Sequence, residues 1–146
     1  MPRTFMFDTN VFDRITKGIV AGGLPEGARA AVTHIQRDEL ADTADAGLRA
    51  RLLAVLGERA QERLLTESAV WGVSRWGEAK WGEGDLYSRM LAALNAIKKH
   101  RNNEKDILIA ETALKLGHVL VTTDGALKEV MRQFGGEVAD PQEVLR

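Results

Sequence analysis

Residues 4–10 read TFMFDTN, an apolar run that ends abruptly in polar side chains. This pattern predicts a buried strand over Thr4–Phe7 that stops at Asp8. A second run of the same kind, VLVTTD, predicts a strand over Val119–Val121 that is followed by Asp124. Ligands of open α/β sheets bind beyond the carboxyl ends of the strands, so both acids are candidates for a functional site.

Between and after these two runs the chain alternates between helical and strand patterns. The further strands expected are Ala28–Val32, Ser68–Val73 and an edge strand over Glu137–Ala139. The helices expected are Val11–Ile19, one that begins at the capping-box pair Thr33 and Gln36, and Gly47–Leu65. Three more helices are expected after these: one with Leu86, Met90, Leu94 and Ile97 on one stripe, one from Asn103 to Gly117, and one over Ala126–Phe134. Strands separated by helices require crossover connections, so the expected fold class is α/β with a mostly parallel sheet.

The length, composition and charge of the chain exclude several kinds of protein and of site. The length of 146 residues suits a single domain, here residues 1–146. The chain has no cysteine, which excludes disulfides, thiolate nucleophiles and Cys-ligated zinc and fits a reducing cytoplasm. We expect neither a membrane helix nor a secretory signal, because no apolar run is long enough. The net charge is −1, so any nucleic-acid role must come from a local site or from metal ions bound by the acids.

Two more acids fall on predicted helices near the same edge of the sheet. Asp106 lies in the first turn of one helix, and Glu39 lies in the second turn of another. Glu39 follows Ile35 by four residues and shares its inward stripe, whereas Asp38 is rotated by about 100° toward water. A carboxylate on a core-facing stripe needs a partner, and that stripe offers no Lys or Arg, so a metal ion is a candidate.

Each of these acids also has a purely structural interpretation. Asp8 and Asp124 could cap helices, Asp106 would suit a helix N-terminus, and Glu39 could be solvated. What favours a site is the arrival of four acids at one edge. Two carboxylates about 4 Å apart repel by ~4 kcal/mol at an effective dielectric near 20, so such a cluster needs protons or cations. Carboxylate oxygens suit Mg²⁺ or Mn²⁺, and the matching chemistry is phosphodiester hydrolysis.

Three segments of the chain resemble the signature segments of PIN-domain nucleases. They are FDTNV at residues 7–11, DILIAETA at residues 106–113 and VTTD at residues 121–124. The likeness is greatest to the VapC-like ribonuclease toxins of prokaryotic toxin–antitoxin pairs, and it spans nearly the whole chain.

The resemblance implies a fold, an activity and partners. The implied fold has three layers, with a five-stranded parallel sheet between helices. The implied activity is that of a metal-dependent endoribonuclease that hydrolyses single-stranded RNA. The implied site holds Mg²⁺ or Mn²⁺ on Asp8, Glu39, Asp106 and Asp124, with Asn10 and Thr123 as supporting polar residues. The implied partners are the RNA substrate, a cognate antitoxin protein and a second copy in a homodimer.

Two further features admit two interpretations each. Trp76 and Trp81, in a segment with three tryptophans, could stack on RNA bases or could anchor that segment or a dimer contact. The run from Lys98 to Arg101 could meet phosphates, but the interpretation favoured from sequence is that it suits the C-terminal end of a helix dipole.

Two other functions compete with this interpretation of the sequence. A phosphoacceptor receiver domain needs paired acids after its first strand and a Lys after its last core strand. Here Asp8 stands alone and Asp124 is followed by Gly125, which disfavours that class. The other rival is a non-catalytic PIN-like module that binds RNA or protein. The complete set of four acids argues against it, because a degenerate site would be expected to lose at least one.

Overall fold

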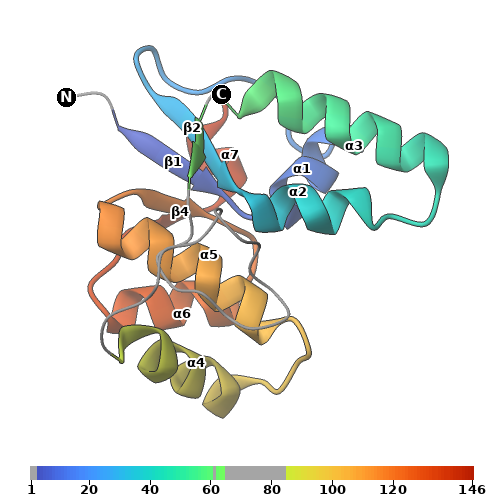
Figure 1. The fold of residues 1–146 in the computed structure, drawn as a ribbon. Helices are drawn as coiled ribbons and strands as arrows, with labels where there is room; N and C mark the ends of the chain where they lie inside the picture. Colours follow the sequence, from blue (N-terminus) through green and yellow to red (C-terminus); the bar gives the residue numbers. More distant parts are fainter. Residues whose placement is uncertain (1–2, 61, 65–84) are drawn as a thin grey trace.

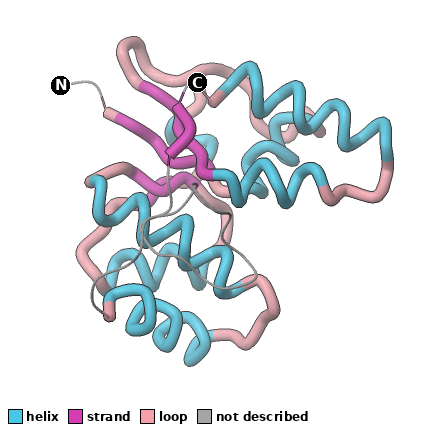
Figure 2. Tube along the Cα trace, viewed as in Figure 1, coloured by secondary structure: helices cyan, strands magenta, loops and turns pink. Residues whose placement is uncertain are grey.

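The computed structural model describes residues 3–60, 62–64 and 85–146, and within them five parallel strands form one sheet. The strands are β1 (Thr4–Phe7), β2 (Arg29–Thr33), β3 (Glu62–Leu64), β4 (Val119–Val121) and β5 (Val138–Ala139). Their order is β3-β2-β1-β4-β5, so β1 is the central strand. Phe5 pairs with Ala30 on one side and with Val119 on the other. All four pairings are parallel, so the predicted parallel sheet is confirmed. Figure 2 shows the strands in magenta.

Helices cover both faces of this sheet. They are α1 (Thr9–Thr16), α2 (His34–Ala41), α3 (Ala46–Arg59), α4 (Leu86–Ile97), α5 (Asn103–Leu116), α6 (Gly125–Gln133) and α7 (Pro141–Val144). Figure 1 shows α4, α5 and α6 on one side of the strands, with α1, α3 and α7 on the other. The three-layer α/β/α architecture implied by the resemblance is confirmed.

Successive side chains of the central strand belong to two different apolar cores, one on each face of the sheet. Phe5 and Phe7 contribute to the core under α1 and α3, whereas Met6, between them, contributes to the core under α4, α5 and α6. All three side chains are at least nine-tenths buried. Because successive side chains of a strand point to opposite faces, one short apolar strand supplies both layers. In the described residues, no helix is long and apolar enough to cross a membrane.

The course of the chain creates a crevice at the carboxyl edge of the sheet. From the central β1 the chain proceeds outward to β2 and β3, and it then returns to the other side of β1 to add β4 and β5. The strand order therefore reverses between β1 and β4. A crevice at the carboxyl ends of the strands is expected at such a switch point. Asp8 and Asp124 follow the two strands on either side of it.

Several predicted element boundaries were wrong. The helix predicted over Gly47–Leu65 ends at Arg59, and residues 62–64 instead form β3, which pairs with β2. The helix predicted over Val11–Ile19 is α1, which begins at Thr9 because Asp8 caps it. Helix α7 was not expected from the sequence. The strand predicted over Ser68–Val73 lies outside the described residues.

Candidate active site

Asp8 ends β1 and caps α1. Its backbone amide donates to Val121 O at 2.9 Å, which continues the ladder between β1 and β4. Its Oδ1 accepts from the backbone amide of Thr9 at 2.8 Å, so the capping interpretation holds. Asp8 is only 5% exposed, and burial raises the pKa of its carboxyl against the opposing hydrogen bonds from Thr122 and Thr9. The residue is therefore both a helix cap and a buried acid.

The second oxygen of Asp8 is held by two side chains. Thr122 Oγ1 donates to Asp8 Oδ2 at 2.7 Å, and Asn10 Nδ2 donates to the same oxygen at 3.3 Å. Thr122 Oγ1 also accepts from the backbone amide of Asp124 at 3.1 Å. The hydroxyl that links the two acids therefore belongs to Thr122. The supporting role was assigned from sequence to its neighbour Thr123.

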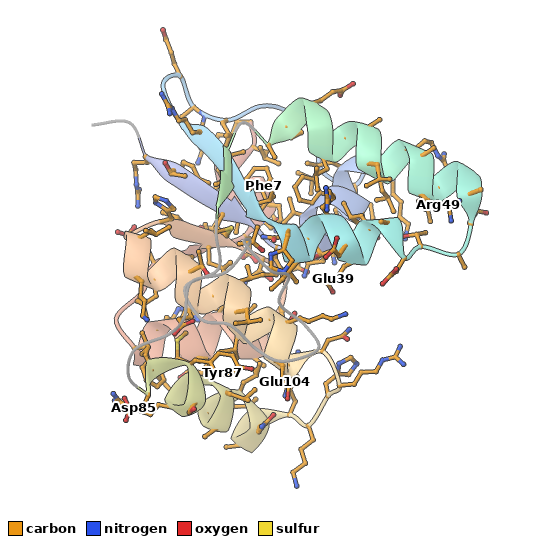
Figure 3. All side chains as sticks on the ribbon, in the orientation of Figure 1. Phe7, Glu39, Arg49, Asp85, Tyr87 and Glu104 are labelled. Atoms are coloured by element: carbon orange, nitrogen blue, oxygen red, sulfur yellow. The ribbon has the colours of Figure 1, made fainter. Side chains whose placement is uncertain are left out.

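Glu39 reaches the same place from α2. Its Oε1 accepts from Thr9 Oγ1 at 2.8 Å, so the hydroxyl at the start of α1 is the partner that the sequence did not reveal. Burial raises the pKa of Glu39, and the charge of Asp8 adds to this effect. Figure 3 shows Glu39 on the side of α2 that faces α5. Asp38, the adjacent acid, instead pairs with Arg37 at 3.5 Å.

Asp106 is a third acid of the cleft with a raised pKa. It lies in the first turn of α5. Burial raises its pKa to about 8, and the charges of Asp8 and Glu39 act in the same direction. These electrostatic effects mean that the acids from β1, α2 and α5 lie close enough to repel one another.

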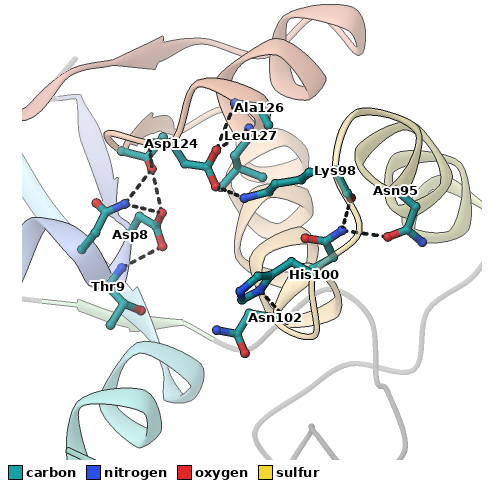
Figure 4. Close-up of polar contacts among 12 residues, drawn as sticks. Asp8, Thr9, Asn95, Lys98, His100, Asn102, Asp124, Ala126 and Leu127 are labelled. Atoms are coloured by element: carbon teal, nitrogen blue, oxygen red, sulfur yellow. Dashed lines mark hydrogen bonds and ion pairs between the residues drawn. The ribbon is translucent and has the colours of Figure 1, made fainter.

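Asp124 caps α6 and carries an ion pair. Its Oδ1 accepts from the backbone amides of Ala126 at 3.0 Å and Leu127 at 3.3 Å, and its Oδ2 accepts from Lys98 Nζ (Figure 4). Burial favours the neutral carboxyl. The bonds from Lys98 and the two amides outweigh that effect and lower the pKa of Asp124. Asp124 is thus the acid of the four that stays charged most readily.

All four acids line one cleft of about 380 Å³. Its lining combines the carboxylates with polar and apolar residues of α1, α2, α3 and the connection between α2 and α3: Thr9, Asn10, Asp13, Leu40, Thr43, Leu48 and Leu52. The four segments that provide the acids are separated by up to 116 positions in the sequence and meet only in the folded chain. The structure therefore brings together every acid singled out from the sequence.

The donor set fits a hard divalent cation. The carboxylates are mutually repelling oxygen ligands, and a cation would relieve that repulsion. The buried carbonyl oxygen Oδ1 of Asn10, at the same cleft, has no hydrogen-bond partner in the structure. As the side chains stand, however, no group of three or more His, Cys, Asp or Glu in the described part of the chain is arranged to hold a metal ion. Lys98 and Thr9 occupy carboxylate oxygens that such an ion would use.

Three residues of this site were missed from the sequence. Thr9 and Thr122 were missed because a hydroxyl gives no periodic signal, although both lie inside the quoted signature segments. Lys98 lies 26 residues before Asp124, and no local pattern pairs them. Trp76 and Trp81, proposed from sequence as RNA-stacking residues, lie outside the described residues.

Several solved structures have a fold similar to that of this chain. Over 94% of its length, the chain matches 98% of a chain of VapBC2 from Rickettsia felis bound to a DNA fragment from their promoter, at TM-score 0.53 and 13% identity. It matches VapBC-1 from nontypeable Haemophilus influenzae at TM-score 0.50 and 18% identity, again covering 94% and 98% of the two chains. FitAcB from Neisseria gonorrhoeae gives TM-score 0.50 and 13% identity, with 96% and 99% covered.

The fold of this chain is a VapC-like PIN fold. The resemblance drawn from the three sequence segments is thereby confirmed at the level of fold. No family model matches the sequence, and no curated protein matches it either. In this VapC-like PIN fold, the four acids lie at the carboxyl edge of the sheet, beside its switch point.

Proposed function

We propose that this protein is a metal-dependent endoribonuclease that hydrolyses phosphodiester bonds of single-stranded RNA. The observation that carries the proposal is the cleft itself, in which Asp8, Glu39, Asp106 and Asp124 converge from four segments of a VapC-like PIN fold. Mg²⁺ or Mn²⁺ held by these carboxylates would polarise the phosphate, lower the pKa of bound water and stabilise the leaving oxygen.

The residues of the chain have separate tasks in this mechanism. Thr122 and Asn10 hold Asp8 in one orientation, and Thr9 does the same for Glu39. The site thus keeps its acids preorganised by hydrogen bonds from rigid element ends. Burial and the charges of Asp8 and Glu39 raise the pKa of Asp106 to about 8, so a cation held by these carboxylates would compete with the proton on Asp106.

The partners proposed for the protein follow from the fold. The solved structures that it resembles include VapBC toxin–antitoxin complexes, and we propose that a cognate antitoxin likewise binds this chain and blocks its cleft. A homodimer and a place in the cytoplasm belong to the same proposal. Trp76 and Trp81 stay candidates for stacking on RNA bases.

Cleavage of RNA with and without metal tests the activity directly. The purified protein should cleave labelled single-stranded RNA with Mg²⁺ or Mn²⁺ and should stop when EDTA is added. Glu39→Gln should abolish cleavage, because it removes one carboxylate from the cleft. Asp38→Asn is the matched control, since it removes a neighbouring charge that is paired with Arg37, and it should leave cleavage nearly intact.

Two outcomes would contradict this proposal in different ways. Robust cleavage in EDTA would remove the metal from the mechanism. RNA binding without cleavage under any metal would favour the non-catalytic binding module instead. Equal loss in Glu39→Gln and Asp38→Asn would place neither residue specifically in the site.

A further inference from the structure

Four consecutive residues between α4 and α5, Lys98, Lys99, His100 and Arg101, form a basic segment that we call the 98–101 loop. From sequence, the favoured interpretation was that this run suits the C-terminal end of a helix dipole. In the structure, Lys98 is the C-cap residue of α4, and its backbone amide donates to Leu94 O at 2.9 Å. The side chain of Lys98 pairs with Asp124, and the other three basic residues follow in the connection to α5. A position after the end of α4 therefore leaves a second role open to Lys99, His100 and Arg101.

The loop has a defined conformation. Asn103, which is 2% exposed, donates from Nδ2 to Lys98 O and to Asn95 Oδ1, both at 2.8 Å. The backbone amide of Asn103 donates to His100 O at 3.1 Å, and that of Asn102 donates to His100 Nδ1 at 3.1 Å. These bonds attach the loop to the ends of α4 and α5. Because Nδ1 of His100 accepts, its Nε2 is the nitrogen that remains to donate outward.

The loop begins at the acidic cleft and leads away from it. Lys98 Nζ pairs with Asp124, which fixes one end of the loop at the cleft (Figure 4). The other three side chains are exposed and line, with Asn95, an open hollow of about 490 Å³. The residue directly before this hollow, Lys98, thus contacts the acidic cleft, and the hollow itself is lined by two cationic side chains and an imidazole donor.

This neighbouring charge matters because the substrate of the proposed reaction is a polyanion. The cleft carries four acids and is also lined by Asp13, and the net charge of the protein is −1. Neither the acidic cleft nor the net charge of the protein attracts RNA over a distance. The phosphates that flank the reacting phosphate therefore need cations close to the cleft. The 98–101 loop presents cations at that position.

We propose that the 98–101 loop binds the sugar–phosphate backbone of single-stranded RNA immediately beside the acidic cleft. Lys99 and Arg101 each pair with a phosphate, and His100 Nε2–H donates to a phosphate oxygen between them. The loop thereby fixes the path of the strand on the α4–α5 side of the cleft. This inference rests on the proposed function, because it takes RNA as the ligand.

Equilibrium binding tests the loop independently of cleavage. The probe is a labelled single-stranded RNA of about a dozen nucleotides, in the size range that single-strand-binding proteins cover. All proteins carry Asp106→Asn, so that the RNA is not consumed, and binding is followed by fluorescence anisotropy with Mg²⁺ across a salt series. For single strands, each phosphate contact contributes about 0.7 to the slope of log affinity against log salt.

Lys99→Ala/Arg101→Ala removes two phosphate contacts and should therefore lower the magnitude of that slope by about 1.4. If the variant and the parent bind RNA equally well near 1 M salt, this change in slope weakens binding by the variant about 25-fold at ~0.1 M salt. The matched control is Arg29→Ala/Arg132→Ala, which removes the same charge elsewhere. Arg29 begins β2 at the opposite end of the sheet, and Arg132 is in the last turn of α6, which Asp124 begins. The control should bind nearly as well as the parent, and Lys99→Arg/Arg101→Lys should bind within a few-fold of it.

The results separate this inference from the function on which it rests. An unchanged slope in the loop variant, or an equal loss in the control, overturns the role of the loop even if the wild type cleaves RNA. A loop-specific loss supports it even if the wild type cleaves no RNA, in which case the nuclease proposal alone fails. Melting temperatures check folding, and Lys99→Gln/Arg101→Gln repeats the comparison with longer side chains.

Discussion

The two oxygens of Asp8 explain how one residue satisfies two interpretations that its position left open. Oδ1 caps α1 through Thr9, while Oδ2 takes bonds from Thr122 and Asn10 beside the other acids. Asp124 does the same at α6, with Lys98 on its second oxygen. A helix N-terminus favours a negative charge, so caps at the carboxyl edge of a sheet also place acids in the crevice there.

The raised pKa of Asp106 makes the stability of the metal-free protein depend on pH. Its pKa is raised to about 8 in the folded protein, so between the unfolded value near 4 and that value the folded state binds more protons than the unfolded one. The free energy of unfolding of the metal-free protein must then fall as pH rises through this window. The asparagine side chain of Asp106→Asn is neutral throughout this pH range. It should stabilise the metal-free protein by about 1–3 kcal/mol at ~pH 8 and by little near pH 4.

Urea unfolding in EDTA at several pH values measures this difference. Glu104→Gln is the matched control, because Glu104 lies in the same first turn of α5 but is exposed. It should not stabilise the protein and should leave the pH dependence unchanged. If Asp106→Asn and Glu104→Gln shift stability alike, Asp106 is not in repulsive contact with the other acids.

At the residue scale, sequence reasoning found the acids but not the groups that hold them. Glu39 was placed inward by its spacing from Ile35, and the structure puts it in the cleft beside Asp8. Periodicity gives the phase of a helix, and this is sufficient to separate Glu39 from Asp38. It carries no information about hydrogen bonds from another element, which is why Thr9 and Lys98 were not predicted as partners.

At the scale of elements, α2 shows where local sequence determines structure. Thr33 and Gln36 were predicted to form a capping box, and both of its bonds are present. Gln36 Nε2 also donates to Phe7 O at 3.1 Å, which ties α2 to the end of β1. Both Thr33 and Gln36 are fully buried. This single cap therefore sets the position of the helix that carries Glu39 relative to Asp8.

Replacing the cap residue tests that role. Thr33→Val keeps the shape of the side chain but loses the bond from the amide of Ile35 and the bond to Gln36 Oε1. It should cost about 1–2 kcal/mol of stability, because buried groups are left unsatisfied. Asp45→Ala removes the exposed cap of α3 and should cost less, about 0.5–1 kcal/mol, since water can replace it. Equal costs in chemical denaturation would show that burial of the Thr33 cap adds nothing.

The boundary between α3 and β3 shows where local sequence fails. The apolar spacing of α3 continues without a breaker, so the predicted helix extended to Leu65. In the structure the chain is extended at Ala60, and Leu64 pairs with Thr33 of β2. A strand of three residues obtains its hydrogen bonds from a neighbour that is distant in sequence, and no window of local sequence contains that neighbour.

At the scale of the whole molecule, the fold matters because it assembles acids that the unfolded chain keeps apart. Asp8 follows β1, Glu39 and Asp106 lie in α2 and α5, and Asp124 precedes α6. The four acids meet where the strand order reverses between β1 and β4. The α/β class and the parallel sheet could be predicted from alternation alone. The convergence of the acids could be predicted only because all carboxyl ends of a parallel sheet share one edge.

A ligand held by residues from four segments binds the folded protein and not the unfolded chain, so it must stabilise the whole molecule. Saturating Mg²⁺, at about 100 times its Kd, should raise the free energy of unfolding by ~2.7 kcal/mol, seen as a higher melting temperature at ~pH 8. The gain should shrink toward pH 5, because protons on acids with raised pKa values compete with the ion.

Asp8→Asn should lose most of the stabilisation by Mg²⁺. Asp13→Asn removes a charge from the same cleft, where Asp13 pairs with Lys17 at 2.9 Å, and should keep most of it. If both variants gain as much as the wild type, Asp8 does not hold the ion.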